Sequence, residues 1–162
     1  MTEGIPVVRM YTDASGHTRF ARMQIPVESR TGLGSVGLFS SLFLNQNIHD
    51  NTGDLKTQFA LTPVPENLKG EGPKLAHTAP RRQLVLTLSG CLEFKSCDVD
   101  EDDAEYKVII RRGDILLAED LEGAGHVWKF VESSDGNFYS WIRCYIHLGE
   151  EYDHFVSQLI PI

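Results

Sequence analysis

Most of the chain alternates apolar and polar positions in short runs, and almost no segment repeats apolar residues at helical spacing. Such alternation is typical of β-strands, and glycines, prolines or acidic clusters separate the runs. Short strands at a spacing of roughly 8–12 residues indicate an all-β jelly-roll barrel with little helix. Besides the run after His77, we expect strands at residues 5–11, 17–25, 38–44, 56–61, 91–97, 106–111, 115–120, 127–132 and 138–148.

The first two runs, 5–11 and 17–25, flank the turn-forming residues 12–16 and predict an N-terminal hairpin that ends at Pro26. Residues 28–37 hold three glycines and are interpreted as a loop. The length and glycine content of residues 27–74 as a whole fit a lid over a pocket and an inert surface loop equally well.

The end of the chain, residues 150–162, predicts one helical turn or a strand that pairs with a partner. Its apolar residues are expected to pack on another surface, and edge strands of a two-sheet fold need covering. We therefore expect a homodimer. The apolar residues of this tail are Phe155, Val156, Leu159, Ile160 and Ile162.

The most organised stretch runs from His77 to Trp128, with His77 and His126 near its ends. Because strand side chains alternate faces, Arg81 and Gln83 should point the same way as His77. Polar residues at the ends of apolar strands that face one interior are how small β-barrels build pockets. The stretch therefore predicts a small-molecule pocket.

This stretch resembles the cupin family, whose two motifs are G-x5-H-x-H-x3,4-E-x6-G and G-x5-P-x-G-x2-H-x3-N. Aligned back from Gly90, the family's glutamate falls on Gln83, its first histidine on His77 and its second on Ala79. In the second motif Gly113 opens the segment and His126 matches the histidine, with two extra residues before it. Gly123 or Gly125 occupies the turn, and the family's proline and asparagine are absent.

The resemblance implies a double-stranded β-helix, the cupin jelly-roll barrel, in a single domain over residues 1–162. The barrel core would cover roughly 70–148, after an N-terminal hairpin and loop (1–69) and before a C-terminal tail (149–162). The family's usual site has three imidazoles and one carboxylate. Here His77, His126 and the amide of Gln83 would remain, which implies either no cofactor or a weakly held divalent metal.

Several side chains near the motifs are candidates for catalysis or substrate binding. Either His77 or His126 would act as general base and acid. Inward-facing Arg81 offers a planar donor fork for a carboxylate, enolate or phenolate, although a structural ion pair with Asp120 or Glu119 is an equal alternative. Asp120 would orient His126 or act as the base itself.

Gln83 and three aromatic residues are candidates for substrate binding: Trp128, Tyr139 and Trp141. The aromatic residues of the last long strand, 138–148, either line the pocket or pack between the sheets, and packing is the favoured alternative. His17, Tyr145 and His147 are secondary candidates.

These residues favour a lyase- or isomerase-type cupin enzyme that moves protons without redox change. Dehydration, cyclisation or decarboxylation of a small oxygenated metabolite would fit. The alternatives are a metal-dependent dioxygenase, by analogy with the wider family, and a cupin that binds a small molecule without catalysis.

Composition narrows the classes of partner. The net charge of −8 argues against nucleic acid or an anionic membrane. No stretch of about twenty apolar residues occurs, so we expect no membrane association. Three cysteines without CxxC spacing favour a reduced setting, and a cytoplasmic location is the simplest expectation.

Overall fold

The computed structural model describes residues 4–30, 34–37, 57–66, 75–97, 99, 103–149 and 152–162. Within them the chain is almost entirely β-structure, as the alternation predicts. The strands are β1 (Gly4–Thr12), β2 (Thr18–Arg30), β3 (Gly34–Gly37), β4 (Thr57–Thr62), β5 (Gln83–Ser89), β6 (Cys91–Ser96), β7 (Lys107–Arg111), β8 (Ile115–Glu119), β9 (His126–Phe130), β10 (Trp141–His147) and β11 (Ile160–Pro161). The helix among the described residues, α2 (Tyr152–Ser157), is far too short to cross a membrane.

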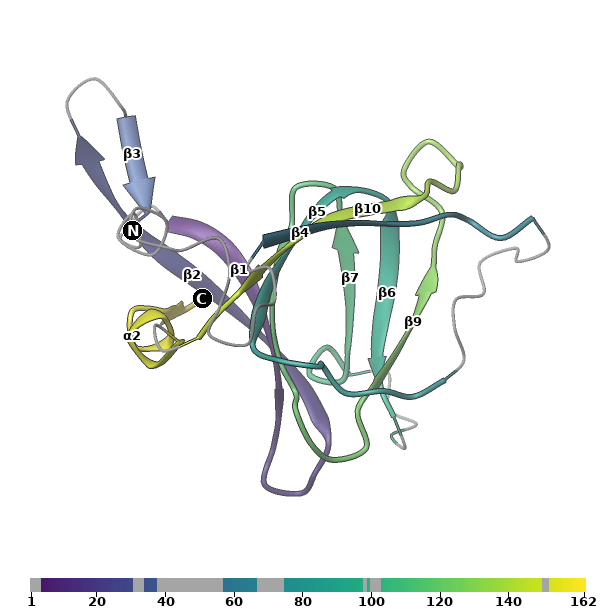
Figure 1. Cartoon of the computed structure of the whole chain (residues 1–162), viewed down its shortest axis with the longest axis horizontal. Helices are drawn as coiled ribbons and strands as arrows, with labels where there is room; N and C mark the ends of the chain where they lie inside the picture. Colours follow the sequence, from purple (N-terminus) through teal and green to yellow (C-terminus); the bar gives the residue numbers. More distant parts are fainter. Residues whose placement is uncertain are drawn as a thin grey trace.

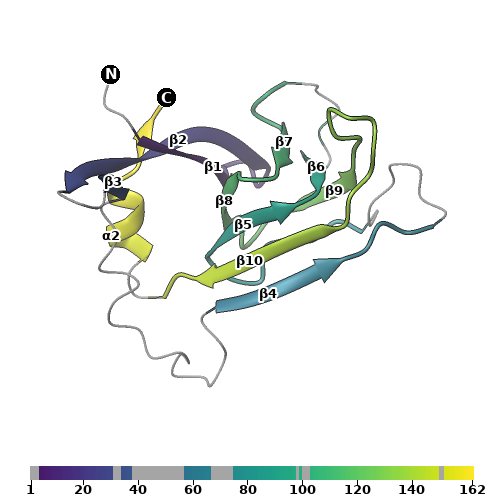
Figure 2. The ribbon, with the colours of Figure 1, turned by 90° about the horizontal axis from the view of Figure 1, so that it is seen from above.

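The strands form two hydrogen-bonded sheets. The large sheet has the order β11-β2-β1-β8-β5-β10-β4, with β3 on β2, and the small sheet has the order β7-β6-β9. β1 and β8 pair in parallel, whereas the other pairings are antiparallel. Figures 1 and 2 show the small sheet as a separate layer that faces the β8-β5-β10 part of the large sheet. The all-β class is confirmed, and the jelly-roll barrel stays a prediction.

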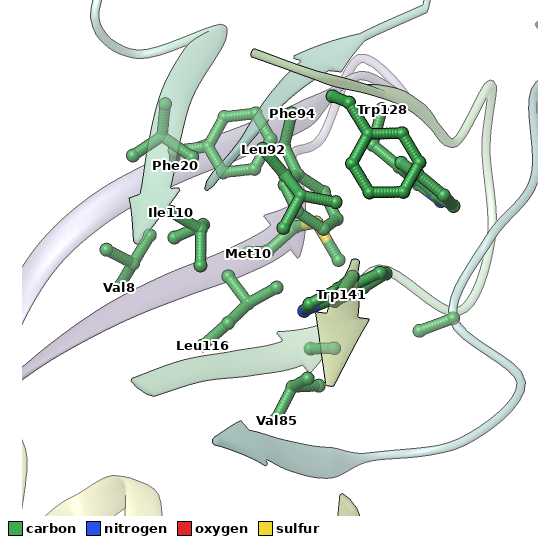
Figure 3. Packing of buried hydrophobic residues seen from close by; sticks show 14 residues of the cluster. Val8, Met10, Phe20, Val85, Leu92, Phe94, Ile110, Leu116, Trp128 and Trp141 are labelled. Atoms are coloured by element: carbon green, nitrogen blue, oxygen red, sulfur yellow. The ribbon is translucent and has the colours of Figure 1, made fainter. Parts of the chain in front are cut away.

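The large sheet is apolar on both faces because each face covers a different core. One face packs against the small sheet and forms the inner core, to which Val8, Val85 and Leu116 belong (Figure 3). The other face packs against α2 and forms the outer core, to which the adjacent Leu84 and Leu117 belong. Consecutive side chains of a strand point to opposite faces, so neighbouring residues enter different cores.

The C-terminal tail packs on its own chain. Phe155 of α2 is 1% exposed in the outer core, and Leu159 lies beside it. β11 then pairs with Met23 and Gln24 of β2. The tail therefore forms both a helical turn and a strand, but the strand adds to an intramolecular sheet. Its burial no longer supports the homodimer, which stays a prediction.

The N-terminal hairpin is confirmed, and its described pairing ends at Pro26, opposite Gly4, although β2 itself does not end there. β2 continues to Arg30 and pairs with β3, so much of the segment 28–37 is strand instead of loop. Pro26 is the end residue of the β1–β2 ladder, and it lies between the residues that pair with β11 and those that pair with β3. A residue without an N–H is tolerated where the partner of a strand changes.

The remaining predicted strands agree with β4 and β6 to β9 within one or two residues. β10 is shorter than predicted, because residues 138–140 belong to the connection after the Ser133–Asn137 turn. The strand predicted at 38–44 lies outside the described residues, and so does most of the 27–74 segment for which a lid was considered.

Packing of the tail predicts a measurable loss of stability. We expect Phe155→Ala to lower the free energy of unfolding by about 3–5 kcal/mol, because it empties a fully buried aromatic site. The control Ile162→Ala changes a side chain that is 66% exposed and should shift stability by less than about 0.5 kcal/mol. Denaturant unfolding followed by circular dichroism measures both. Equal effects of the two changes would show that the tail does not pack on the sheet.

Candidate functional site

A cavity of about 510 Å³ opens at the edge of the inner core, a size typical of small-molecule sites. Its walls come from the inner faces of β5, β8 and β10, from β6 and β9 of the small sheet, and from the segment before β5. The described residues that line it are Met10, Gln58, Leu75, His77, Ala79, Pro80, Arg81, Gln83, Val85, Phe94, Leu116, Ala118, His126, Trp128, Trp141, Arg143, Tyr145 and His147.

His77 and His126 are joined through their backbones. Each donates its N–H to the carbonyl of the other, at N···O distances of 3.1 and 2.9 Å, and their ring centroids lie 4.5 Å apart. Gly125 makes this approach possible: its φ is +76°, and a Cβ there would lie 2.5 Å from the carbonyl oxygen of His77. The structure thus brings the two predicted histidines together, with His77 exposed at the mouth and His126 buried.

His126 is held by Asp120, whose side chain is fully buried. The imidazole Nδ1–H donates to Asp120 Oδ2 over 2.6 Å, which fixes the tautomer and leaves Nε2 for the cavity. The Thr18 hydroxyl donates to the same carboxylate oxygen (3.0 Å), and the Ala79 N–H donates to Oδ1 (3.3 Å). A carboxylate that orients the base in this way is the arrangement of many general-base sites.

Glu119 takes a different role, as its opposite parity requires. Its carboxylate pairs with Arg9 at 2.5 Å and accepts a hydrogen bond from the Tyr152 hydroxyl on the outer side of the large sheet. Burial and the hydrogen bond to Glu119 both raise the pKa of Tyr152. Glu119 therefore connects the large sheet to α2, whereas Asp120 orients the His126 side chain that lines the cavity.

Arg81 and Gln83 both line the cavity, as their shared parity predicts. Gln83 is buried at the start of β5, opposite His147 of β10. Arg81 Nη1 lies 3.4 Å from Nδ1 of the same histidine. The described contacts of Asp120 are with Thr18, Ala79 and His126, and those of Glu119 are with Arg9 and Tyr152, so neither carboxylate pairs with Arg81 among these described contacts.

The inner face of β10 forms another wall of the cavity. Strand alternation places four side chains on this face: Trp141, Arg143, Tyr145 and His147. Trp141 was predicted to bind substrate, whereas Arg143 was not among the predicted site residues. Strand alternation places Arg143 on the same face as Trp141, but the sequence alone did not show which face of the strand points into the cavity. Trp141 both packs in the inner core and lines the cavity, 5.1 Å from Trp128 between ring centroids (Figure 3).

Tyr139, predicted to bind substrate, lies elsewhere. It sits in the connection before β10, its side chain is 43% exposed, and it does not line the cavity. Its hydroxyl donates to Asp135, and this hydrogen bond raises the pKa of Tyr139 and lowers that of Asp135. The prediction assumed that β10 begins at residue 138, and the strand begins three residues later.

The cysteines offer no activated nucleophile. Cys91, Cys97 and Cys144 are free thiols with buried side chains. Burial raises the pKa of the Cys91 and Cys144 thiols, which keeps them protonated and poorly nucleophilic. Chemistry in the cavity therefore depends on its imidazoles, guanidinium groups and amide.

The side chains expected to hold a metal all line the cavity, but their chemistry falls short of the cupin ligand set. His77 and His126 supply imidazoles, Gln83 supplies a neutral amide, and Ala79 supplies no side-chain donor. A divalent cation would meet no carboxylate among the described lining residues. The described lining residues therefore do not fit a tightly bound divalent metal.

No protein-family model matches the chain, and neither the curated proteins nor the solved structures contain a significant match.

Restoring the missing donors tests whether these positions face one centre. We expect Ala79→His with Gln83→Glu to raise Ni(II) affinity by on the order of 3 kcal/mol, because complete protein metal sites reach roughly 10–16 kcal/mol. Calorimetric titration measures this change. A matched control, Ile142→His with Leu88→Glu, adds the same residue types at exposed positions on the other face of the sheet. If the folded cavity variant binds nickel no better than this control, the positions do not converge.

Proposed function

We propose that the cavity is the active site of an enzyme that catalyses proton transfer without redox change on a small oxygenated metabolite. Dehydration, cyclisation, decarboxylation and isomerisation belong to this class. The observation that carries the proposal is the buried Asp120–His126 pair, whose second ring nitrogen is left for the cavity. We also propose a cupin-like jelly-roll. The alignment of His77 and His126 with the cupin motifs supports it, as does the facing of the two sheets around the cavity.

In this mechanism His126 Nε2 removes a proton from the substrate. Asp120 accepts the Nδ1–H hydrogen bond throughout and stabilises the imidazolium that forms. The carboxylate is desolvated and already held by Thr18 and Ala79, so it needs no rearrangement when the charge develops. The buried position of His126 also limits competition from bulk water.

The electron pair released by deprotonation moves toward an oxygen of the substrate. Arg81 and the amide N–H groups of Gln83 line the same cavity and would donate hydrogen bonds to this oxygen. The proton then returns from His126, or from His77 at the mouth, to a carbon or to a departing hydroxyl group. An imidazole suits both directions because it exchanges protons near neutral pH.

The first test is deuterium incorporation. Wild-type protein would be incubated in D₂O with a panel of small hydroxy, keto and enol acids, and exchange at carbon would be followed by NMR. We expect His126→Gln to abolish exchange and Asp120→Asn to slow it by about 10²–10⁴-fold, since general acid–base groups contribute this much. Prior treatment with a chelator should leave the rate unchanged.

Glu119→Gln is the matched control. It changes the adjacent carboxylate, which lies outside the cavity and bonds to Arg9 and Tyr152, so the exchange rate of the folded protein should stay within about twofold of wild type. Exchange that persists in His126→Gln would overturn the assignment of the base. Binding of panel compounds without any exchange would favour the non-catalytic alternative.

A further inference from the structure

Arg143 occupies a built position in the wall of the cavity. Its Nε donates to the Tyr145 hydroxyl, and its Nη1 donates to the Thr62 hydroxyl (2.9 Å) and the Trp141 carbonyl (3.4 Å). The guanidinium lies 3.9 Å above the Trp141 ring and 5.1 Å from the Tyr145 ring. These contacts come from β10 and the neighbouring β4, so the planar group is fixed in position.

All of these contacts are made to neutral groups. Among the described residues, no carboxylate lies within ion-pair distance of Arg143, whereas Arg9 pairs with Glu119 and Arg19 pairs with Asp13 and Glu105. The chain carries a net charge of −8, so carboxylates are abundant. The planar donor fork of a guanidinium matches a carboxylate. Arg143 lines the cavity and bonds only to neutral groups among the described residues, so its charge is suited to an anionic ligand.

The rest of the cavity supports an anionic ligand with a flat apolar body. The described lining residues include two arginines and three histidines, but neither aspartate nor glutamate. Trp128, Trp141 and Phe94 contribute aromatic faces and edges, with Trp141 5.8 Å from Phe94 between ring centroids. Phe94 in turn lies 5.6 Å from His126, so an aromatic surface leads from Arg143 to the proposed base.

We propose that Arg143 binds the carboxylate of the substrate, and that the substrate is a small planar aromatic or conjugated carboxylic acid. The acid group would bond to the guanidinium, and the flat body would lie along Trp141 and Phe94 toward His126. This inference deepens the proposed function, because it names the substrate class of the same cavity. Its test measures binding and does not depend on turnover.

Benzoate and benzamide are suitable probes, because they share size and shape and differ in charge. Both tryptophans of the chain line the cavity, so their emission reports on its occupancy. We expect benzoate to change the emission saturably and to bind at least about tenfold more tightly than benzamide, as a charged hydrogen-bonded pair requires. Calorimetry provides a second measurement. Absence of benzoate binding, or equal binding of the two probes, would overturn the proposal.

Substitution then tests the residue itself. Arg143→Met should weaken benzoate by about tenfold or more and leave benzamide within about twofold. Arg143→Lys keeps the charge without the fork, so it should still prefer benzoate while binding it several-fold more weakly than wild type. The control Arg82→Met removes an exposed arginine that stacks on Tyr152 outside this cavity, and neither affinity should change. Unchanged benzoate affinity in both Arg143 variants would refute its role.

Different measurements test the proposed catalytic activity and the proposed ligand class, so one can be contradicted without the other. His126→Gln should abolish deuterium exchange and retain the preference for benzoate, because the base and the carboxylate anchor are different residues. If wild-type protein binds benzoate selectively but shows no exchange, the proposed catalytic activity is contradicted and the proposed ligand class is supported. If Arg143→Met leaves the exchange rate unchanged, the role of Arg143 in substrate binding is contradicted and the proposed catalytic activity is supported.

Discussion

The buried carboxylate of Asp120 connects three segments that are distant in sequence. It accepts hydrogen bonds from Thr18 in β2, from the backbone of Ala79 before β5, and from His126 in β9. A charge out of contact with water is costly unless it is fully hydrogen-bonded, so these donors and the carboxylate constrain one another. The N-terminal hairpin of the large sheet, the segment before β5 and β9 of the small sheet meet at this point, and the hydrogen bond to Asp120 orients the imidazole.

The same arrangement explains why a cavity remains within a packed interior. Where Val8, Leu92 and Ile110 meet between the two sheets, apolar side chains fill the space between the layers. Toward the other end of β5 and β10, the inward positions hold Gln83 and His147, which face each other in register. These buried polar side chains line the cavity. The outer core packs on the opposite face of the same sheet.

Much of the fold was predictable because strand alternation is a local property. The N-terminal hairpin, the strands from β6 to β9 and the shared inward face of Arg81 and Gln83 all follow from a period of two. The errors have local causes as well. The loop predicted at 28–37 is largely strand because β2 gains β3 as a partner beyond Pro26, and Tyr139 lies outside the cavity because β10 begins after it.

The sequence by itself determined the all-β class and the faces of the strands around His77 and His126. It also determined the donor types at the candidate site, since Gln83 offers a neutral amide and Ala79 offers no side-chain donor. Only the tertiary structure decided that Asp120 supports His126, that the tail covers its own sheet, and that Arg143 faces the cavity without a carboxylate partner among the described residues. Periodicity assigns side chains to one of two faces, but the long-range pairing of strands decides what each face meets.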